Sequence, residues 1–133
     1  MIFLDTSAIY AMADQADPLY ERAKERFKAL LDMGEEILTH NYVLVEAMAL
    51  IQSRLGLIAA LKLAHDCHAF EIEWVDEATH GEAVHCLTNL GKRQVSLVDQ
   101  VSFLIMRRRG VRMALAFDAD FEREGFQLFL ADR

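Results

Sequence analysis

The sequence predicts an α/β fold built on a mainly parallel sheet of five strands, and three features support this prediction. Short apolar segments with the length of strands recur along the chain. Longer segments, whose apolar residues follow helical spacing, separate most of them, which is typical of parallel sheets with helical connections. Glycines 34, 56 and 110 stand where the helical spacing stops, as expected at helix ends.

The predicted strands differ in how they should be buried. Residues 1–4 are wholly apolar and end abruptly at Asp5, as in a strand buried on both faces. Residues 70–75 alternate between acidic and apolar side chains, as in a half-buried strand. The strands are expected at residues 1–4, 36–40, 70–75, 111–117 and 127–130.

Helices are predicted between these strands, several with recognisable start signals. Asp17 precedes Pro18, which suits an N-cap followed by the first helical position. Asn41 is expected to cap the helix Tyr42–Leu55, which is apolar nearly all round and should therefore be largely buried. Further helices are expected directly after Asp5-Thr6-Ser7 and at Leu57–Phe70, Glu77–Leu90 and Ser96–Arg109.

The composition predicts one core-rich domain spanning residues 1–133. Hydrophobic residues make up 53% of the chain. No apolar run reaches the roughly 20 residues of a membrane helix, and the N-terminus lacks the pattern of a signal peptide. Cys67 and Cys86 have neither metal-ligand spacing nor the density of a disulfide scaffold, so reduced thiols are expected. A cytoplasmic protein without membrane association follows.

The chain is acidic, with 21 Asp and Glu residues against 14 Lys and Arg residues and a net charge of −7. Binding to nucleic-acid phosphates usually needs a basic surface. Two interpretations stay open: the acids are spread over solvated helix faces, or some of them gather in a site where bound cations neutralise them.

Four acids are placed where they can meet at one edge of the sheet. Asp5 and Asp118 directly follow predicted strands, and ligands bind at the carboxyl ends of parallel strands. Asp99 lies in the first turn of a predicted helix, and Glu46 lies near the start of another. Both helices begin at the same edge, so all four carboxylates can converge there.

Each aspartate also has a purely structural interpretation. Asp5 and Asp118 can cap helices that follow them, and Asp99 can form a capping arrangement with Ser96. Glu46 fits such an interpretation least, because no other charged residue lies in the first three turns of its apolar helix. A buried carboxylate is normally paired or bound to a metal, so its partner is either a distant arginine or a cation.

A cluster of carboxylates is expected to hold cations. Without them, each close pair repels by on the order of several kcal/mol at intermediate dielectric. Mg²⁺ and Mn²⁺ prefer oxygen ligands, and one or two such ions suit the attack of metal-activated water on a phosphodiester. Zinc is not expected, because the five histidines form no ligand motif.

Four segments, in order along the whole chain, resemble the four motifs of PIN-domain nucleases. Any one of them is weakly specific, whereas all four in order are strongly so. The length and arrangement most resemble the VapC-type toxins of toxin–antitoxin pairs. The segments are Ile2–Ala8 (IFLDTSA), Val43–Glu46 (VLVE), Ser96–Ser102 (SLVDQVS) and Ala116–Phe121 (AFDADF).

The resemblance implies a three-layer α/β/α sandwich, flavodoxin-like in topology, and cleavage of RNA by an endonuclease that depends on Mg²⁺ or Mn²⁺. It implies that Thr6 or Ser7 orients Asp5 or a metal-bound water, and that Asp120 either adds a ligand or is exposed. It also implies an RNA substrate, a cognate antitoxin that occupies the site, and frequent homodimers. By position, the catalytic and metal-binding acids are Asp5, Glu46, Asp99 and Asp118.

Other functions fit the sequence less well. A haloacid-dehalogenase-like phosphatase needs an aspartate where Ser7 stands, and a receiver domain needs a lysine near the last strands, where none follows Lys92. The main alternative is a non-catalytic or RNA-processing PIN-like module that binds RNA or a protein, although such a role would not require four acids. Candidate contacts to the RNA backbone, which solvated helix ends explain equally well, are Lys92, Arg93, Arg107, Arg108, Arg109 and Arg112.

Overall fold

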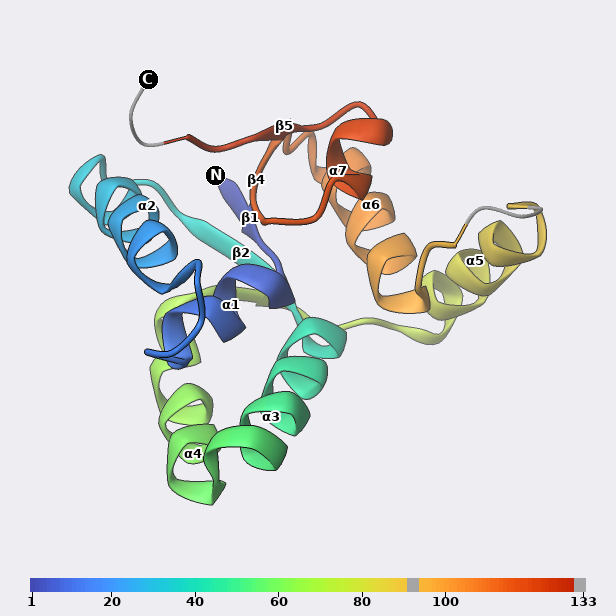
Figure 1. Ribbon diagram of the computed structural model, residues 1–133. Helices are drawn as coiled ribbons and strands as arrows, with labels where there is room; N and C mark the ends of the chain where they lie inside the picture. The colour runs from blue at the N-terminus through green and yellow to red at the C-terminus, as the bar shows by residue number, and fades with distance from the viewer. Residues whose placement is uncertain (91–93, 131–133) are drawn as a thin grey trace.

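Five parallel strands in the order β3-β2-β1-β4-β5 form the centre of the protein, seen here in a computed structural model that describes residues 1–90 and 94–130 (Figure 1). β1 pairs with both β2 and β4 and is buried throughout, which agrees with its wholly apolar sequence. The prediction of a mainly parallel, five-stranded sheet is confirmed. The strands are β1 (Ile2–Leu4), β2 (Ile37–His40), β3 (Glu71–Glu73), β4 (Met113–Leu115) and β5 (Gln127–Leu128).

Helices flank the sheet on both sides and give the expected α/β/α sandwich. Figure 1 shows α1, α2 and α4 on one side of the sheet and α5, α6 and α7 on the other. The segment expected to be one helix to residue 70 ends earlier, in a single turn of 3₁₀ helix, η1. The helices are α1 (Thr6–Ala13), α2 (Tyr20–Asp32), α3 (Asn41–Leu55), α4 (Leu57–Asp66), η1 (Cys67–Ala69), α5 (Glu77–Thr88), α6 (Leu97–Arg109) and α7 (Asp120–Arg123).

A group of aromatic rings packs the elements of the carboxyl edge together. The ring of Phe121 on α7 lies 6.0 Å from that of Phe3 on β1 and 5.1 Å from that of Phe103 on α6, measured between centroids. All three side chains are fully buried. Burying one such side chain contributes about 1.5–3 kcal/mol to the free energy of unfolding. The core thereby fixes α7 and the start of α6 relative to the end of β1.

The start of α2 differs from the prediction. The helix begins at Tyr20 with Leu19 as its N-cap, not at Pro18 after Asp17. The Asp17 carboxylate accepts a hydrogen bond from the Leu19 N–H at 2.8 Å, which closes a turn before the helix. Asp17 therefore stabilises the approach to α2 and does not cap it.

The predicted cap of α3 is also wrong. His40 is the N-cap, and its Nδ1 accepts a hydrogen bond from the Val43 N–H at 3.4 Å. The Asn41 side chain instead accepts a hydrogen bond from the Val75 N–H at 2.7 Å, a contact with the segment after β3. Sequence spacing cannot show that contact, because it joins residues far apart in the chain.

α3 is only partly buried, contrary to the prediction. Val43, Leu44 and Ala47 lie in the core, whereas 65% of the Val45 surface is exposed. Leu55 at the end of the helix is exposed as well. The apolar residues of α3 therefore serve two surfaces, and one of them faces solvent.

Two other expectations can be compared with the described part of the chain. Cys67 and Cys86 are both free thiols, as expected. Among residues 1–90 and 94–130, no helix combines the length and the apolar character that crossing a bilayer requires.

Candidate metal and nuclease site

Asp5 is held by both strands next to its own. Its backbone N–H donates to the Leu115 carbonyl at 3.1 Å, which extends the pairing of β1 with β4. On the other side, the Thr39 hydroxyl of β2 donates to the Leu4 carbonyl at 3.0 Å. The Asp5 side chain is buried, so its carboxylate has a fixed position at the carboxyl edge.

Ser7 joins the Asp5 carboxylate to the end of β4. The Ser7 hydroxyl donates to Asp5 Oδ2 at 2.7 Å, and the Ser7 N–H donates to the same oxygen at 3.2 Å. The hydroxyl in turn accepts a hydrogen bond from the Phe117 N–H at 3.0 Å. Thus one hydroxyl orients Asp5 and also holds the segment that leads to Asp118.

Three further aspartates approach one another beside Asp5. One carboxylate oxygen from each of Asp99, Asp118 and Asp120 lies within 4.8 Å of the others. Asp99 stands in the first turn of α6, where its N–H donates to the N-cap hydroxyl of Ser96 at 3.1 Å. Asp118 follows β4, and its Oδ1 accepts a hydrogen bond from the Asp120 N–H at 2.9 Å. Strand ends and helix starts therefore supply the whole group, as the placement rule predicts.

The carboxylates raise the proton affinity of their neighbours. The pKa of Asp99 is raised to about 7, first by burial and then by the negative charges of Asp5, Asp118 and Asp120. The pKa of Asp5 is also raised, mainly by burial and to a small extent by Asp118, although the hydrogen bonds from Ser7 act in the opposite direction. Carboxylates in this state favour either a proton or a cation.

The donor set fits a hard divalent cation. Carboxylate oxygens are the ligands that Mg²⁺ and Mn²⁺ prefer, and the three oxygens are close enough together to share one ion. Thr6, next to Asp5, adds a second observation: within the described residues its buried hydroxyl oxygen has no hydrogen-bond partner. Such an oxygen is available to a metal-bound water.

Glu46 is not brought into this group. It lies half-buried on α3, near the open surface formed by Val45, and it does not belong to the three carboxylates that meet within 4.8 Å. Asp120 belongs to that group instead. Its Oδ1 accepts a hydrogen bond from Arg123 at 2.6 Å.

Three of the arginines expected to contact RNA lie in the last turn of α6, at the other end from Asp99, and they have protein partners. Arg107 pairs with Glu124 at 2.7 Å, and Arg108 donates to the Thr79 hydroxyl at 3.0 Å. Arg109 pairs with Glu71 and Glu73 of β3. Arg112 is exposed at the same end, and Lys92 and Arg93 lie outside the described residues.

Two arginines near the site were not identified from the sequence. Arg123 pairs with Asp120, and the spacing of three residues on one helix is a signal that could have revealed it. Arg26 of α2 lies over the Phe117 ring, 5.2 Å from its centroid. No local pattern joins residues 26 and 117, so only the fold shows this contact.

His40 connects two of the elements that carry the site. Its Nε2 lies 2.8 Å from the Ser102 hydroxyl, which donates to the Val98 carbonyl at 3.0 Å. Burial lowers the pKa of His40 to about 3, so the ring is neutral. The contact connects the end of β2 with α6 one turn after Asp99.

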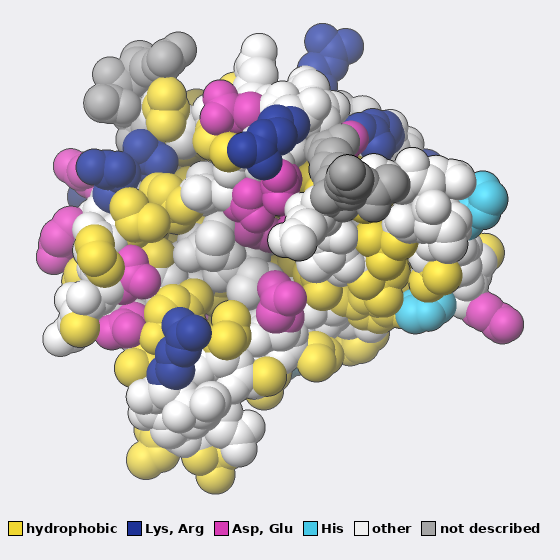
Figure 2. Space-filling view, turned by 45° about the vertical axis from the view of Figure 1, so that its right-hand side comes forward, with side chains coloured by type: hydrophobic (Ala, Val, Ile, Leu, Met, Phe, Trp, Pro, Cys, Tyr) yellow, Lys and Arg dark blue, Asp and Glu magenta, His cyan; other side chains and the backbone are white. Residues whose placement is uncertain are grey.

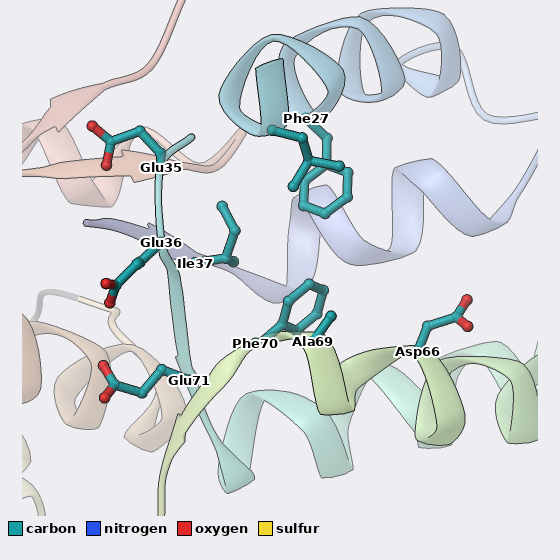
Figure 3. A pocket seen from close by; sticks show the side chains of 9 residues that line it. Phe27, Glu35, Glu36, Ile37, Asp66, Ala69, Phe70 and Glu71 are labelled. Carbon is teal, nitrogen blue, oxygen red and sulfur yellow. The ribbon is translucent and has the colours of Figure 1, made fainter. Parts of the chain in front are cut away.

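The surface views separate the acidic group from a hollow at the other edge of the sheet. Figure 2 shows Asp and Glu side chains gathered near the centre of one face, with a Lys or Arg side chain beside them. A hollow of about 700 Å³ lies instead at the opposite, amino edge of the sheet. There Phe27 and Phe70 face each other, with Glu35, Glu36 and Glu71 along one side (Figure 3). This hollow does not contain the residues of the acidic group.

A parallel α/β sandwich with aspartates at the carboxyl ends of β1 and β4 and at the start of α6 defines a class of metal-dependent nucleases. Comparison with protein families matches the PIN domain over residues 2–126, and the chain belongs to that family.

Its relatives include the 23S rRNA-specific endonuclease VapC20 of Mycobacterium tuberculosis, found in two strains. The identity is 33% over 128 residues, which cover 95% of both chains. The crystal structure of that VapC20, described as a Sarcin-Ricin loop cleaving toxin, superposes with a TM-score of 0.85 at 32% identity. The superposition covers 95% of this chain and 96% of the other. The expectations of a PIN fold and of an endoribonuclease of the VapC toxin type are therefore confirmed.

Proposed function

We propose that the carboxyl edge of the sheet is the catalytic centre of this endoribonuclease, with a divalent cation, Mg²⁺ or Mn²⁺, held by the aspartates. The observation that carries the proposal is the approach of Asp99, Asp118 and Asp120 to within 4.8 Å at the edge where Asp5 is buried. Bound there, the cation supplies an activated water for attack on the phosphodiester.

The residues of the chain divide the remaining work. Asp99 and Asp118 are the principal ligands. Asp99 stands in the first turn of α6 and Asp118 follows β4, so both have a fixed backbone. Asp5, oriented by Ser7, completes the ligand set from the centre of the sheet, and Thr6 orients a water. Asp120 is a secondary ligand, since Arg123 already occupies one of its oxygens.

Glu46 is proposed as a weaker metal ligand than the aspartates. Its support is its place in the second PIN motif, and its half-buried position suits contact through water or with a second ion. The proposal therefore involves three to five carboxylates and one or two ions, and metal titration would count the ions.

The substrate and partners extend the comparison with the relatives. We propose that this chain cleaves a loop of ribosomal RNA, because VapC20 is named as a 23S rRNA-specific endonuclease and described as a Sarcin-Ricin loop cleaving toxin. We further propose that it acts in the cytoplasm, binds a cognate antitoxin that covers the site, and forms homodimers.

A cleavage assay tests the catalytic assignment. Purified full-length protein, incubated with a ribosomal RNA hairpin and Mg²⁺ or Mn²⁺, is expected to cut the RNA at one position, and chelation by EDTA should stop the reaction. Asp5→Asn and Asp99→Asn should abolish cleavage. Asp32→Asn, at an exposed aspartate at the end of α2, is the matched control and should cleave normally. Equal activity in all three variants would refute the assignment.

A further inference from the structure

An exposed aromatic surface lies at the same edge of the sheet as the acidic group. Trp74, the single tryptophan of the chain, directly follows β3 and is 71% exposed. Most of this large ring faces water, so packing in the core does not account for it. A tryptophan exposed to this extent beside the acidic group is a candidate for binding a ligand, because the bases of unpaired RNA stack on such rings.

Tyr42 and His80 lie on the two helices next to the segment that carries Trp74. The Val75 N–H bond to the Asn41 side chain places the backbone after Trp74 beside the start of α3. Tyr42, the next residue of α3, hydrogen-bonds His80 of α5 at 2.5 Å, and their rings meet edge to face at 5.8 Å. The three side chains therefore come from elements that are tied together.

Strand register places this aromatic surface close to the aspartates. Glu73 is aligned with His40 across β3 and β2, and the register of β2 with β1 brings Asp5 level with His40. Two strand spacings, about 10 Å, therefore separate the ends of β3 and β1. The His40 ring lies 6.1 Å from the Tyr42 ring, measured between centroids. Its Nε2 lies 2.8 Å from the hydroxyl of Ser102, which stands one turn after Asp99 on α6. The segments that carry Trp74, Tyr42 and His80 thus lie beside the elements of the catalytic centre and are connected to them through the buried His40.

The composition of the surface favours the faces of bases over phosphates. Its nearest charged neighbours in sequence are acids: Glu73, Asp76 and Glu77. Val45 on α3 and Val84 on α5, one turn beyond Tyr42 and His80, are also exposed. Figure 2 shows hydrophobic side chains between the central acidic group and the histidines on this face. Unpaired RNA bases bind proteins largely by stacking on aromatic side chains.

We propose that Trp74, Tyr42 and His80 form a base-stacking subsite for single-stranded RNA next to the catalytic centre. The proposal rests on the proposed function, since it assumes that RNA is cut at the aspartates. A base stacked at Trp74 holds the strand at one point while the cation at the aspartates holds the phosphate at another. The subsite thereby selects unpaired segments, because a base within a duplex has no free face.

Binding is tested apart from cleavage with Asp99→Asn in Mg²⁺. Emission from Trp74 should be quenched in a saturable way by a short single-stranded RNA and not by a duplex of the same sequence. With fluorescently labelled RNA, adding Trp74→Ala to this protein should raise Kd roughly tenfold or more, since stacking of one base corresponds to about 5- to 150-fold. Trp74→Phe should recover part of the loss. Ile58→Ala, at an 86% exposed residue of α4, is the matched control and should change Kd less than twofold.

Cleavage kinetics separate this subsite from the catalytic centre. Trp74→Ala in the otherwise native chain should raise KM by a similar factor and leave kcat within twofold. Unchanged Kd and KM would overturn the subsite, while loss of cleavage in Asp99→Asn would still support the catalytic assignment. Absence of cleavage by the native chain, with Trp74 quenched by RNA, would overturn the catalytic assignment and support the subsite. A shift in sedimentation on Trp74→Ala without a change in Kd would show a protein contact and overturn the proposal.

Discussion

The two edges of the sheet treat acidic side chains in opposite ways. Near the amino edge and along β3, acids meet cations. Glu35 pairs with the N-terminal amine at 2.6 Å, and Arg109 contacts Glu71 at 2.5 Å and Glu73 at 3.2 Å. Such partly exposed pairs neutralise charge locally and contribute little to the free energy of unfolding, about 0–1 kcal/mol each.

At the carboxyl edge, acids meet acids. Asp99 and Asp118 approach each other and Asp120, beside the buried Asp5. Within the described residues, Arg123 pairs with one member of this group, Asp120. A protein can keep an arrangement that costs stability where function requires it. The contrast supports the proposal that the carboxyl edge is the functional one, without reference to any motif.

Removing one carboxylate at this edge should have the largest effect. Asp99→Asn is expected to lower the cleavage rate by more than roughly a hundredfold, because even residues that only support metal ligands contribute about 10–100-fold. The same change should raise the melting temperature of the metal-free protein at pH 8, since it removes a half-buried charge among like charges. Rates in Mg²⁺ and melting curves in EDTA measure the two effects. A fall in both the melting temperature and the cleavage rate would indicate that Asp99 mainly caps α6.

Ser7→Ala should have the next largest effect. It removes the hydroxyl that donates to Asp5 and accepts from Phe117, so the orientation of Asp5 and of the segment after β4 is loosened. Activity is expected to fall by about 10–100-fold, with weaker metal affinity in a titration. Ser53→Ala, at an exposed position of α3, is the control and should behave as the native chain. Native activity in Ser7→Ala would mean that strand pairing alone orients Asp5.

The stability gained in Asp99→Asn should depend on pH. The pKa of Asp99 is about 7 in the folded protein against an ordinary value of 3.8, so its charge destabilises the fold above pH 7. As pH falls from 7 toward 4, the folded protein binds a proton that the unfolded chain does not, and the penalty disappears. The melting temperature of Asp99→Asn minus that of the native protein, both in EDTA, should therefore shrink from pH 8 to pH 5. His40, whose pKa is lowered, is common to both proteins and cancels in the difference. A difference independent of pH would contradict the raised pKa.

Breaking the pairs along β3 should have the smallest effect. Arg109→Met removes the contacts with Glu71 and Glu73 and is expected to lower the free energy of unfolding by up to about 1 kcal/mol. Cleavage should stay within twofold, because the acids of the catalytic centre lie at the other end of α6. Urea unfolding and RNA cleavage measure the two. A tenfold loss of activity at unchanged stability would show that Arg109 contacts RNA after all.

The sequence predicts the centre of the site better than its surroundings. Asp5 and Asp118 are foreseeable because a buried strand must stop before a charge, and the ends of parallel strands share one edge. Asp99 is foreseeable from the S-x-x-D spacing that starts a helix. The role of Asp120 depends on the turn that Asp118 forms with it, and this turn has no separate signal in the sequence.

Contacts between distant segments account for what the sequence does not predict. The apolar residues of α3 suggested a buried helix, yet its exposure depends on which neighbours cover it, and Val45 has few. The cap at His40 replaced the one expected at Asn41, because the Asn41 side chain is used by the segment after β3. The exposure of Trp74 likewise has no local signal, since an alternating strand predicts sides and not which side is covered.

The contact between His40 and Ser102 joins α3 and α6 through one series of hydrogen bonds, in which each group has a fixed role as donor or acceptor. Because Nδ1 accepts from the Val43 N–H, the proton of the neutral ring is on Nε2 and is donated to Ser102, whose own proton goes to the Val98 carbonyl. Each donor in this series has one acceptor, and reversing any one bond would leave two donors facing each other. The Ser102 hydroxyl is therefore needed as an acceptor, and an alanine there would leave a buried N–H without one. The start of α6, and with it Asp99, thus depends on the tautomer of a histidine that takes no part in the chemistry.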